Sequence, residues 1–388
     1  MDLAKAKLLD GPSSLAENDR SGTLACLSVR FALDFNMDGS AGDVARTQVE
    51  RHMRLCLAVT AGRDTLVTLA GSEPLLAEAA YELMEATQSN PVRHLANHSD
   101  LNCVDRGRRG ELVAALLIMR ACDAARAALS GRRWVSVDGF MAELLPPREY
   151  QILKESFPIC YRHGQKHNFL ATFKDYGIWF NHVIKVEKHA MFSAEHLWKF
   201  ITRGAMMLCS NNQEGVDIVI PICHTKKALS PYSVTAIFVQ VKNDEKFNTM
   251  DKSLFDGLNP TKLGLFPPHL DPKVEPRPVI RIVFALAARD AGVDFPKARE
   301  REHHHPDPFT AFDVWCAGLS PATFKHIDVD LVSYINLLER SLRPHDAFEL
   351  QDDPAADKET RRLRGSHRRR MAPLTTDDAA HHAIHLRA

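Results

Sequence analysis

Three polar side chains stand out in two otherwise apolar segments in the middle of the chain. The segment GVDIVIPI holds Asp217, and the segment IFVQVKN holds Gln240 and Lys242. A β-strand points successive side chains to opposite faces, so Gln240 and Lys242 share one face and the two valines beside them share the other. Lysine is seldom fully buried without a partner. We therefore expect Asp217 to lie on the neighbouring strand, with its carboxylate close to the face that carries Gln240 and Lys242.

The order of three elements resembles the PD-(D/E)XK phosphodiesterase superfamily, the fold of many restriction-type nucleases and resolvases. These elements are a helix with an N-terminal Glu, a strand with Asp and a strand with Gln-x-Lys. Glu111 in GELVAALLI matches the optional acidic residue of the first helix, and 22 residues separate Asp217 from Gln240. The chain also looks like the nuclease-like domains of transposon-linked and Crinkler-type effector proteins. This resemblance covers about residues 105 to 345. It implies an α/β fold in which a mixed central sheet is flanked by helices, with a restriction-endonuclease-like core.

The resemblance also implies a metal site and a reaction. Hydrolysis of a phosphodiester uses a hard cation, and Mg²⁺ is commonly held by one or two carboxylates together with water and phosphate oxygens. Asp217 would be the central ligand of Mg²⁺ or Mn²⁺, Gln240 would offer its side-chain carbonyl, and Glu111 would bind the metal or a water. Lys242 would orient the attacking water and offset negative charge in the transition state. We expect a nuclease, with DNA ahead of RNA as its substrate.

Two departures from the family pattern leave alternatives open. Gln240 stands where the family usually has Asp or Glu, which removes a negative charge and should weaken cation binding. Glu111 lies about a hundred residues before Asp217, so Glu195, in the helix just before the Asp217 strand, competes as the acid of the first helix. Asp217 could instead cap a turn, and Lys242 could extend past a strand end to water. The alternative function is a catalytically degenerate nuclease fold that binds nucleic acid or protein as an effector module.

Other polar and sulfur-bearing residues have simpler interpretations. Asn181 and His182 lie between apolar residues in WFNHVIKV, and we interpret them as hydrogen-bonded core groups. The eight cysteines show no CxxC pair, and most lie in apolar runs, which favours buried thiols over disulfides or a zinc site. The run His303–His305 lies in a polar stretch that we expect to be a solvated loop.

The elements that must position these residues follow from the spacing of apolar residues and from the residues that start or end helices. Residues 1–104 should be a mostly helical region, including a helix through TQVERHMRLCLAV, and residues 105–345 should be the nuclease-like domain with insertions. Within that domain we expect a hinge at 105–110, helices at 111–129, 193–209 and 327–342, and strands at DIVIPI, VTAIFVQVK, 278–287 and 309–318. Ser193 is the expected N-cap of the second helix. Residues 346–388 should form a polar, disordered tail with a basic run, RRLRGSHRRR.

Length and composition narrow the class of protein. The chain has 388 residues and a formal net charge of zero at pH 7, so overall basicity does not indicate a nucleic-acid partner, although a local basic cleft remains compatible with it. No phosphate-binding GxxxxGK[ST] loop occurs. The first residues lack the apolar core of a signal peptide, and no apolar run reaches the roughly 20 residues that span a bilayer. We expect an intracellular protein, nuclear or cytoplasmic, with no membrane partner and of undetermined oligomeric state.

Overall fold

The structure is a computed structural model that describes eleven stretches of the chain. These are residues 1–16, 19–33, 40–59, 66–97, 106–129, 134–161, 167–186, 193–209, 215–265, 277–296 and 309–339. Met1–Glu339 form one compact unit, to which every described residue belongs. The predicted basic tail and His303–His305 lie outside the described residues.

The first hundred residues combine helices with one small hairpin. Their elements are α1 (Asp2–Leu8), α2 (Arg20–Phe31), α3 (Ser40–Arg51), β1 (Leu55–Val59), β2 (Leu66–Leu69), α4 (Pro74–Ala86) and α5 (Pro91–Asn97). The predicted helix through RLCLAV is wrong at its end, because the chain leaves the helix after Arg51 and pairs β1 with β2 in antiparallel register. Met53 has a φ of 59°, a left-handed conformation that a helix cannot contain. The chain direction changes there, and the apolar run becomes a strand.

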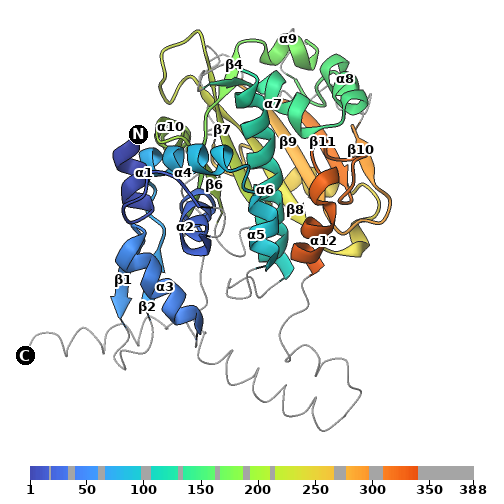
Figure 1. Cartoon of the computed structure of the whole chain (residues 1–388). Helices are drawn as coiled ribbons and strands as arrows, with labels where there is room; N and C mark the ends of the chain where they lie inside the picture. The colour runs from blue at the N-terminus through green and yellow to red at the C-terminus, as the bar shows by residue number, and fades with distance from the viewer. Residues whose placement is uncertain are drawn as a thin grey trace, which may run out of the picture. The chain divides into compact units, whose positions relative to one another are not determined.

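The long helix α6 (Arg106–Ala127) crosses one face of the sheet, as Figure 1 shows. It begins at Arg106, so the hinge predicted at 105–110 is helical over its described part. Gly110, in the first turns, explains the close approach of α6 to the sheet. A Cβ added there would lie 3.1 Å from Cβ of Asn243 and 3.2 Å from Cγ1 of Val241. The missing side chain lets the start of α6 pack directly against the strand that carries Lys242.

The middle of the chain supplies short helices and strands at one end of the sheet. They are β3 (Val135–Ser136), α7 (Val137–Leu144), α8 (Pro147–Glu155), α9 (Phe169–Phe173), β4 (Tyr176–Ile178), β5 (His182–Lys185), α10 (Ala194–Thr202) and β6 (Ala205–Leu208). Ser193 is the N-cap of α10, as predicted, and its hydroxyl accepts a hydrogen bond from the backbone N–H of His196 at 3.3 Å. The predicted continuation of this helix to residue 209 is wrong, because Gly204 at a φ of 63° turns the chain into β6.

The last described part holds the central strands. Its elements are β7 (Ile218–His224), β8 (Val234–Lys242), the 3₁₀ turn η1 (Glu245–Phe247), α11 (Ser253–Gly257), β9 (Pro278–Ala285), β10 (Gly292–Asp294), β11 (Thr310–Ala317), the 3₁₀ turn η3 (Asp328–Asp330) and α12 (Leu331–Glu339). The four strands predicted here are confirmed as β7, β8, β9 and β11, within a few residues of the expected ends. The predicted closing helix is shorter, since its first turn is the 3₁₀ turn η3.

The sheet is mixed and has nine strands in the described part of the chain. Its main path runs β10-β11-β9-β8-β7-β4-β3, and β5 joins through β6, which pairs with β7. The pairs β8–β9 and β9–β11 are parallel, whereas β7–β8 and β6–β7 are antiparallel. Helices lie against the sheet, which agrees with the coarse α/β class expected from the sequence (Figure 1).

Two apolar cores cover the two faces of this sheet. In β8, Val239 belongs to the core under α6 and α7, whereas Phe238 belongs to the core under α10 and α11. The strands β9 and β11 are buried over their whole length, as expected for strands covered on both faces. One charged pair lies inside this sheet, where the Arg281 guanidinium donates to both carboxylate oxygens of Asp313 at 2.6 and 2.7 Å.

Candidate functional site

Asp217 lies at the start of β7, next to the end of β8 that carries Gln240 and Lys242. The two strands pair antiparallel with Ile218 opposite Val239, which confirms the prediction that they are neighbours. The backbone N–H of Asp217 donates to the carbonyl oxygen of Val239 at 2.9 Å. Its carboxylate Oδ2 accepts a hydrogen bond from the backbone N–H of Val241 at 2.6 Å.

This hydrogen bond has a simple geometric origin. The carbonyl of Lys242 accepts from the N–H of Leu286, so the backbone of Lys242 faces β9 and that of Val241 faces the β7 side. The strand pairing of β8 with β7 ends at Ile218. Beyond that point, the Asp217 carboxylate accepts the Val241 hydrogen bond that a further β7 residue would otherwise accept. Burial raises the pKa of Asp217 above its usual value, although the Val241 N–H and the positive charge of Lys242 each act to lower it.

Gln240 contributes a buried oxygen that has no hydrogen-bond partner among the described residues. Its side chain is 7% exposed, and its Oε1 atom is unpaired. Strand alternation places it on the same face as Phe238 and Lys242. A buried carbonyl oxygen without a donor costs about 1–3 kcal/mol, so it is a position where a water or a cation would be favourable.

Lys242 is half-buried at the end of β8. Its ammonium group lies 5.7 Å from the centre of the Phe247 ring in η1, a cation–π arrangement that holds the side chain near the strand end. Its charge also acts on the pKa of Asp217, as stated above. The structure therefore brings Lys242 and Asp217 within electrostatic reach of each other.

Glu111 and Glu195 differ in their surroundings. Burial raises the pKa of the Cys209 thiol well above its usual value, and the negative charges of Asp217 and Glu111 raise it further. Both carboxylates are thus near enough to act on one buried thiol at the end of β6. The Glu195 carboxylate instead accepts a hydrogen bond from Lys199 at 2.9 Å on the exposed side of α10. Of the two acids, Glu111 is the one for which the structure shows an electrostatic link to the surroundings of Asp217.

Few oxygen ligands for a hard cation lie around the end of β8 in the described part of the chain. Within the described ranges, no group of three or more His, Cys, Asp and Glu side chains is arranged to hold a metal ion. At most two carboxylates, Asp217 and Glu111, lie near the end of β8, and the unpaired Oε1 of Gln240 belongs to the face of β8 covered by α10 and α11, whereas α6 covers the other face. Mg²⁺ usually keeps several waters and completes its shell with substrate phosphates. A site with so few protein ligands would have to bind Mg²⁺ in that way.

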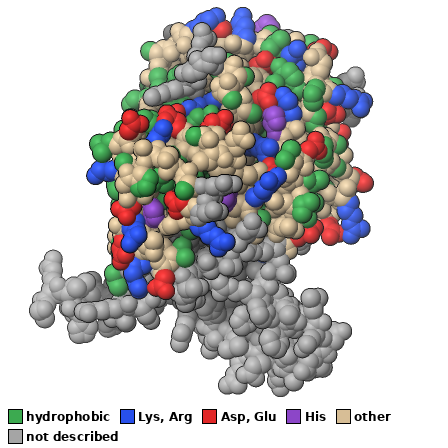
Figure 2. Space-filling model, in the orientation of Figure 1, with side chains coloured by type: hydrophobic (Ala, Val, Ile, Leu, Met, Phe, Trp, Pro, Cys, Tyr) green, Lys and Arg blue, Asp and Glu red, His purple; other side chains and the backbone are tan. Residues whose placement is uncertain are grey.

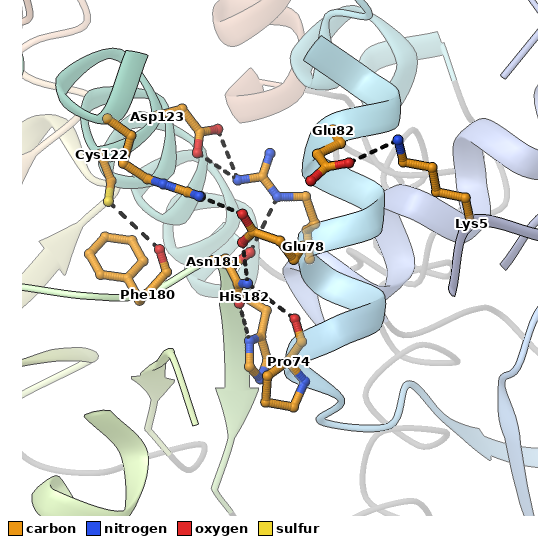
Figure 3. Close-up of polar contacts among 11 residues, drawn as sticks. Lys5, Pro74, Glu78, Glu82, Cys122, Asp123, Phe180, Asn181 and His182 are labelled. Atoms are coloured by element: carbon orange, nitrogen blue, oxygen red, sulfur yellow. Dashed lines mark hydrogen bonds and ion pairs between the residues drawn. The ribbon is translucent and has the colours of Figure 1, made fainter. Parts of the chain in front are cut away.

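A second polar network, which periodicity did not reveal, lies between α2, α4, α6 and β5 (Figure 3). Asn181 and His182 are fully buried and hydrogen-bonded, which confirms their interpretation as core groups. Asn181 Nδ2 donates to Glu78 Oε2 at 2.9 Å, and Arg126 donates to Glu78 Oε1 at 2.7 Å. The only sequence signal for these partners is the presence of charged residues within the apolar helices α4 and α6.

The amide of Asn181 fixes the protonation of His182. Its Nδ2 group faces two acceptors, Glu78 and the carbonyl of Pro74, so its Oδ1 must face Nδ1 of His182 at 2.8 Å. Nδ1 therefore carries the proton, and Nε2 accepts from the hydroxyl of Ser72 at 2.9 Å. Burial, aided by the charge of Arg203, lowers the pKa of His182 to about 4, so the ring stays neutral at pH 7. We interpret this network as the structural connection between α4 and β5.

Comparison with known proteins identifies a family but no characterised relative. No curated protein and no solved structure matches the chain. The described residues contain no helix that is both long and apolar enough to cross a membrane. The family described as Domain of unknown function (DUF8736) matches residues 16–256, a range that contains Glu111, Asp217, Gln240 and Lys242 but ends before β9. Because this match covers more than half of its length, the chain belongs to the DUF8736 family.

Proposed function

We propose that this protein is a metal-dependent phosphodiesterase that cleaves nucleic acid, with DNA ahead of RNA as its substrate. The observation that carries the proposal is the meeting of Asp217, the Val241 backbone and the charge of Lys242 at one end of the β7–β8 pair. The order of helix, Asp strand and Gln-x-Lys strand on a mixed sheet supports a restriction-endonuclease-like core. The start of α6 packs against β8 through Gly110.

Each residue has a defined task in this proposal. Asp217 and Glu111 would bind Mg²⁺ or Mn²⁺, and Gln240 would add its unpaired carbonyl oxygen. The metal, when bound, polarises the phosphate and a water. Lys242 donates to the attacking water or to a phosphate oxygen and stabilises the negative charge of the transition state. Gln240 supplies no charge, so the free site should bind Mg²⁺ weakly and bind it more tightly once phosphate oxygens are present.

The distribution of charged side chains on the surface bears on the kind of partner. On the face seen in Figure 2, acidic and basic side chains are interspersed and neither sign forms a continuous patch. Near the candidate site, Lys246 lies 5.1 Å from the same Phe247 ring as Lys242, but its ammonium also faces Asp244 at 3.7 Å. Binding to a phosphate backbone would therefore depend on a few local cations and should have a shallow salt dependence.

The direct test is cleavage by the full chain. Supercoiled plasmid, linear duplex, single-stranded DNA and RNA are incubated with Mg²⁺ or Mn²⁺, beside a sample that contains a chelator. Lys242→Ala is the test variant, and Lys246→Ala is the matched control, because both lysines contact Phe247 but only Lys242 acts on Asp217. Metal-dependent cleavage that is lost in Lys242→Ala alone supports the proposal. Cleavage that survives in Lys242→Ala places the chemistry elsewhere.

One observation favours the second candidate, a degenerate fold that binds nucleic acid or protein. Asp217 already uses one carboxylate oxygen to close the β8 ladder, and burial raises its pKa, so its charged form is less favoured than that of an exposed aspartate. A binding module would show no cleavage with either metal. It would still bind its partner, and nucleic-acid binding would weaken with added salt.

A further inference from the structure

A cavity of about 490 Å³ lies beside the middle and the C-terminal end of α6, away from Glu111 near its start. Its walls come from the ends of α2 and α4, the start of α5, the middle and end of α6, and α12. None of Glu111, Asp217, Gln240 and Lys242 lines it. Its volume falls in the range of about 300–1,000 Å³ that is typical of small-molecule sites. This cavity is therefore separate from the proposed nuclease site.

Two buried hydroxyl groups line the cavity, and the proton of each has no acceptor among the described residues. They are the Oγ atom of Ser89 and the hydroxyl of Tyr334, whose side chain is fully buried. Burial raises the pKa of Tyr334 to about 12, so its hydroxyl keeps its proton and can donate it. Buried polar groups are nearly always hydrogen-bonded in folded proteins, so two hydroxyl donors left unused on one cavity favour a bound group that accepts from them.

The charges at this end of the cavity leave an excess of positive charge. The buried Asp330 carboxylate accepts from Arg93 at 2.9 Å and from Arg120 at 2.5 Å, so two cations share one anion. Arg120 lines the cavity and donates a hydrogen bond to the oxygen of the Tyr334 hydroxyl. A guanidinium has five N–H donors, and Arg120 directs one to Asp330 and another to Tyr334. The surroundings of Arg120 and Tyr334 therefore favour an anionic group.

Other charged groups on the cavity limit the ligand to one negative charge. Asp123 is already paired, because Arg30 donates to both of its carboxylate oxygens at 2.9 and 2.8 Å. Glu85 is an exposed acid on the cavity wall, and it would repel a second anion. His326 lines the cavity too, but its Nε2 atom lies 2.6 Å from Glu143. The positive charge that Arg93 and Arg120 leave beside Asp330 therefore suits one negative charge, and Glu85 on the same wall opposes any further one.

Apolar side chains form part of the remaining wall, beside the Arg30–Asp123 pair. Along α6 it includes Leu116, Met119, Ala124 and Ala127. At about 1.5 Å per helical residue, Leu116 and Ala127 are about 16 Å apart along the axis. Met84 and Val92 close the opposite side. This shape suits an apolar chain or ring that extends away from the anionic group.

We propose that this cavity binds a small monocarboxylate with an apolar body. The carboxylate accepts hydrogen bonds from the hydroxyls of Ser89 and Tyr334 beside Arg120, and the apolar body lies along α6. Ser89, Tyr334 and Arg120 come from α4–α5, α12 and α6, so the bound acid connects three elements around the cavity. The proposal does not depend on the proposed nuclease activity.

The test uses 4-phenylbutyrate as the probe and 4-phenylbutyramide as its neutral counterpart. Binding of each to the full chain is measured by titration calorimetry and by the shift in melting temperature. The acid should bind and raise the melting temperature in a dose-dependent way, and the amide should bind at least about tenfold more weakly, because it lacks the charge. Equal binding of acid and amide would overturn the anionic site, and no binding of the acid at millimolar concentration would overturn the proposal.

Three variants locate the site. Tyr334→Phe removes one hydroxyl, with its unused donor and the bond that it accepts from Arg120, so it should fold with a slightly lowered melting temperature and bind the acid about tenfold more weakly. Ala124→Leu fills the cavity and should abolish binding, whereas Ala86→Leu, the same change at an exposed position outside the lining, should leave binding unchanged. Full binding by Ala124→Leu would contradict this location, even if Tyr334→Phe proved unstable.

Discussion

The Asp217 carboxylate accepts a hydrogen bond from the backbone N–H of Val241 at 2.6 Å, across the point where β7 stops pairing with β8. The same carboxylate is the proposed central metal ligand. Asp217 therefore has two tasks, one in the sheet and one in the site, and these can be separated because only the second needs the negative charge.

Asp217→Asn should keep the free energy of unfolding unchanged or raise it, because an amide oxygen still accepts from Val241 and the cost of burying a charge is removed. Asp217→Ala should lower it by about 1–3 kcal/mol, because the Val241 N–H loses its partner. Both variants should lose metal-dependent cleavage. Denaturant unfolding and the plasmid assay measure the two effects, and an Asn variant as unstable as the Ala variant would contradict this division.

Lys242→Ala should lower the turnover of nucleic-acid cleavage by about 10²–10³-fold, the loss seen when one preorganised electrostatic group is removed. Binding should change little, with a salt slope reduced by about one unit. Single-turnover cleavage and binding titrations at several salt concentrations separate the two. If the protein is only a binding module, Lys242→Ala will weaken binding and there will be no cleavage to lose.

The cleavage rate should also fall on acidification, and this fall should begin at a higher pH than an ordinary aspartate would give. Burial raises the pKa of Asp217, and the metal binds its deprotonated form, so protonation competes with metal binding as the pH falls. The rate profile in saturating and in limiting Mn²⁺ measures this effect. A rate independent of pH across the weakly acidic range would remove Asp217 from the metal site.

Acid should destabilise the fold through His182. In the unfolded chain its pKa is 6.5, and in the folded protein burial lowers the pKa to about 4, so the unfolded state binds the proton first. The contribution of His182 to the free energy of unfolding is therefore complete above pH 6.5. It falls as the pH drops toward 4, by up to about 3 kcal/mol. Below that value the folded state is protonated too, and this contribution stops changing. His182→Gln, which cannot titrate, should flatten the slope in this pH range.

Gly215→Ala should be more destabilising than Gly264→Ala. Both glycines have a positive φ, 90° and 80°, so both substitutions carry a conformational cost of about 1–2 kcal/mol. A Cβ at Gly215 would lie 2.4 Å from the carbonyl oxygen of Gly257, whereas a Cβ at Gly264 meets nothing within 4 Å. The difference between the two losses in unfolding free energy measures the steric cost of the contact with Gly257. Equal losses would show that the contact with Gly257 adjusts at little cost.

The strands around the site were predictable because each is a buried apolar run bounded by polar or turn residues. This holds for β7, β8, β9 and β11. The ends of helices were less predictable, because the left-handed residues Met53 and Gly204 set them and their apolar neighbours continue the pattern.

The site was predictable only to the level of neighbouring strands. Alternation brings Asp217 near the end of β8, but it does not show that the carboxylate binds the Val241 backbone. The network of His182 depends on Glu78 and Arg126, which lie far from it in sequence. Such pairings are set by how helices pack on the sheet, and spacing along one segment does not contain them.

The place of β8 between β7 and β9 has a consequence for producing this protein in parts. The family match ends at residue 256, after β8 but before β9 and β11. A fragment cut there would keep Asp217 and Lys242 but leave the β9-facing side of β8 as an open edge, from Ile237 to Lys242 in the observed register. Unpaired edges of this apolar kind recruit strands from other chains and aggregate. Expression should therefore extend to Glu339, beyond the matched region, to yield dispersed protein.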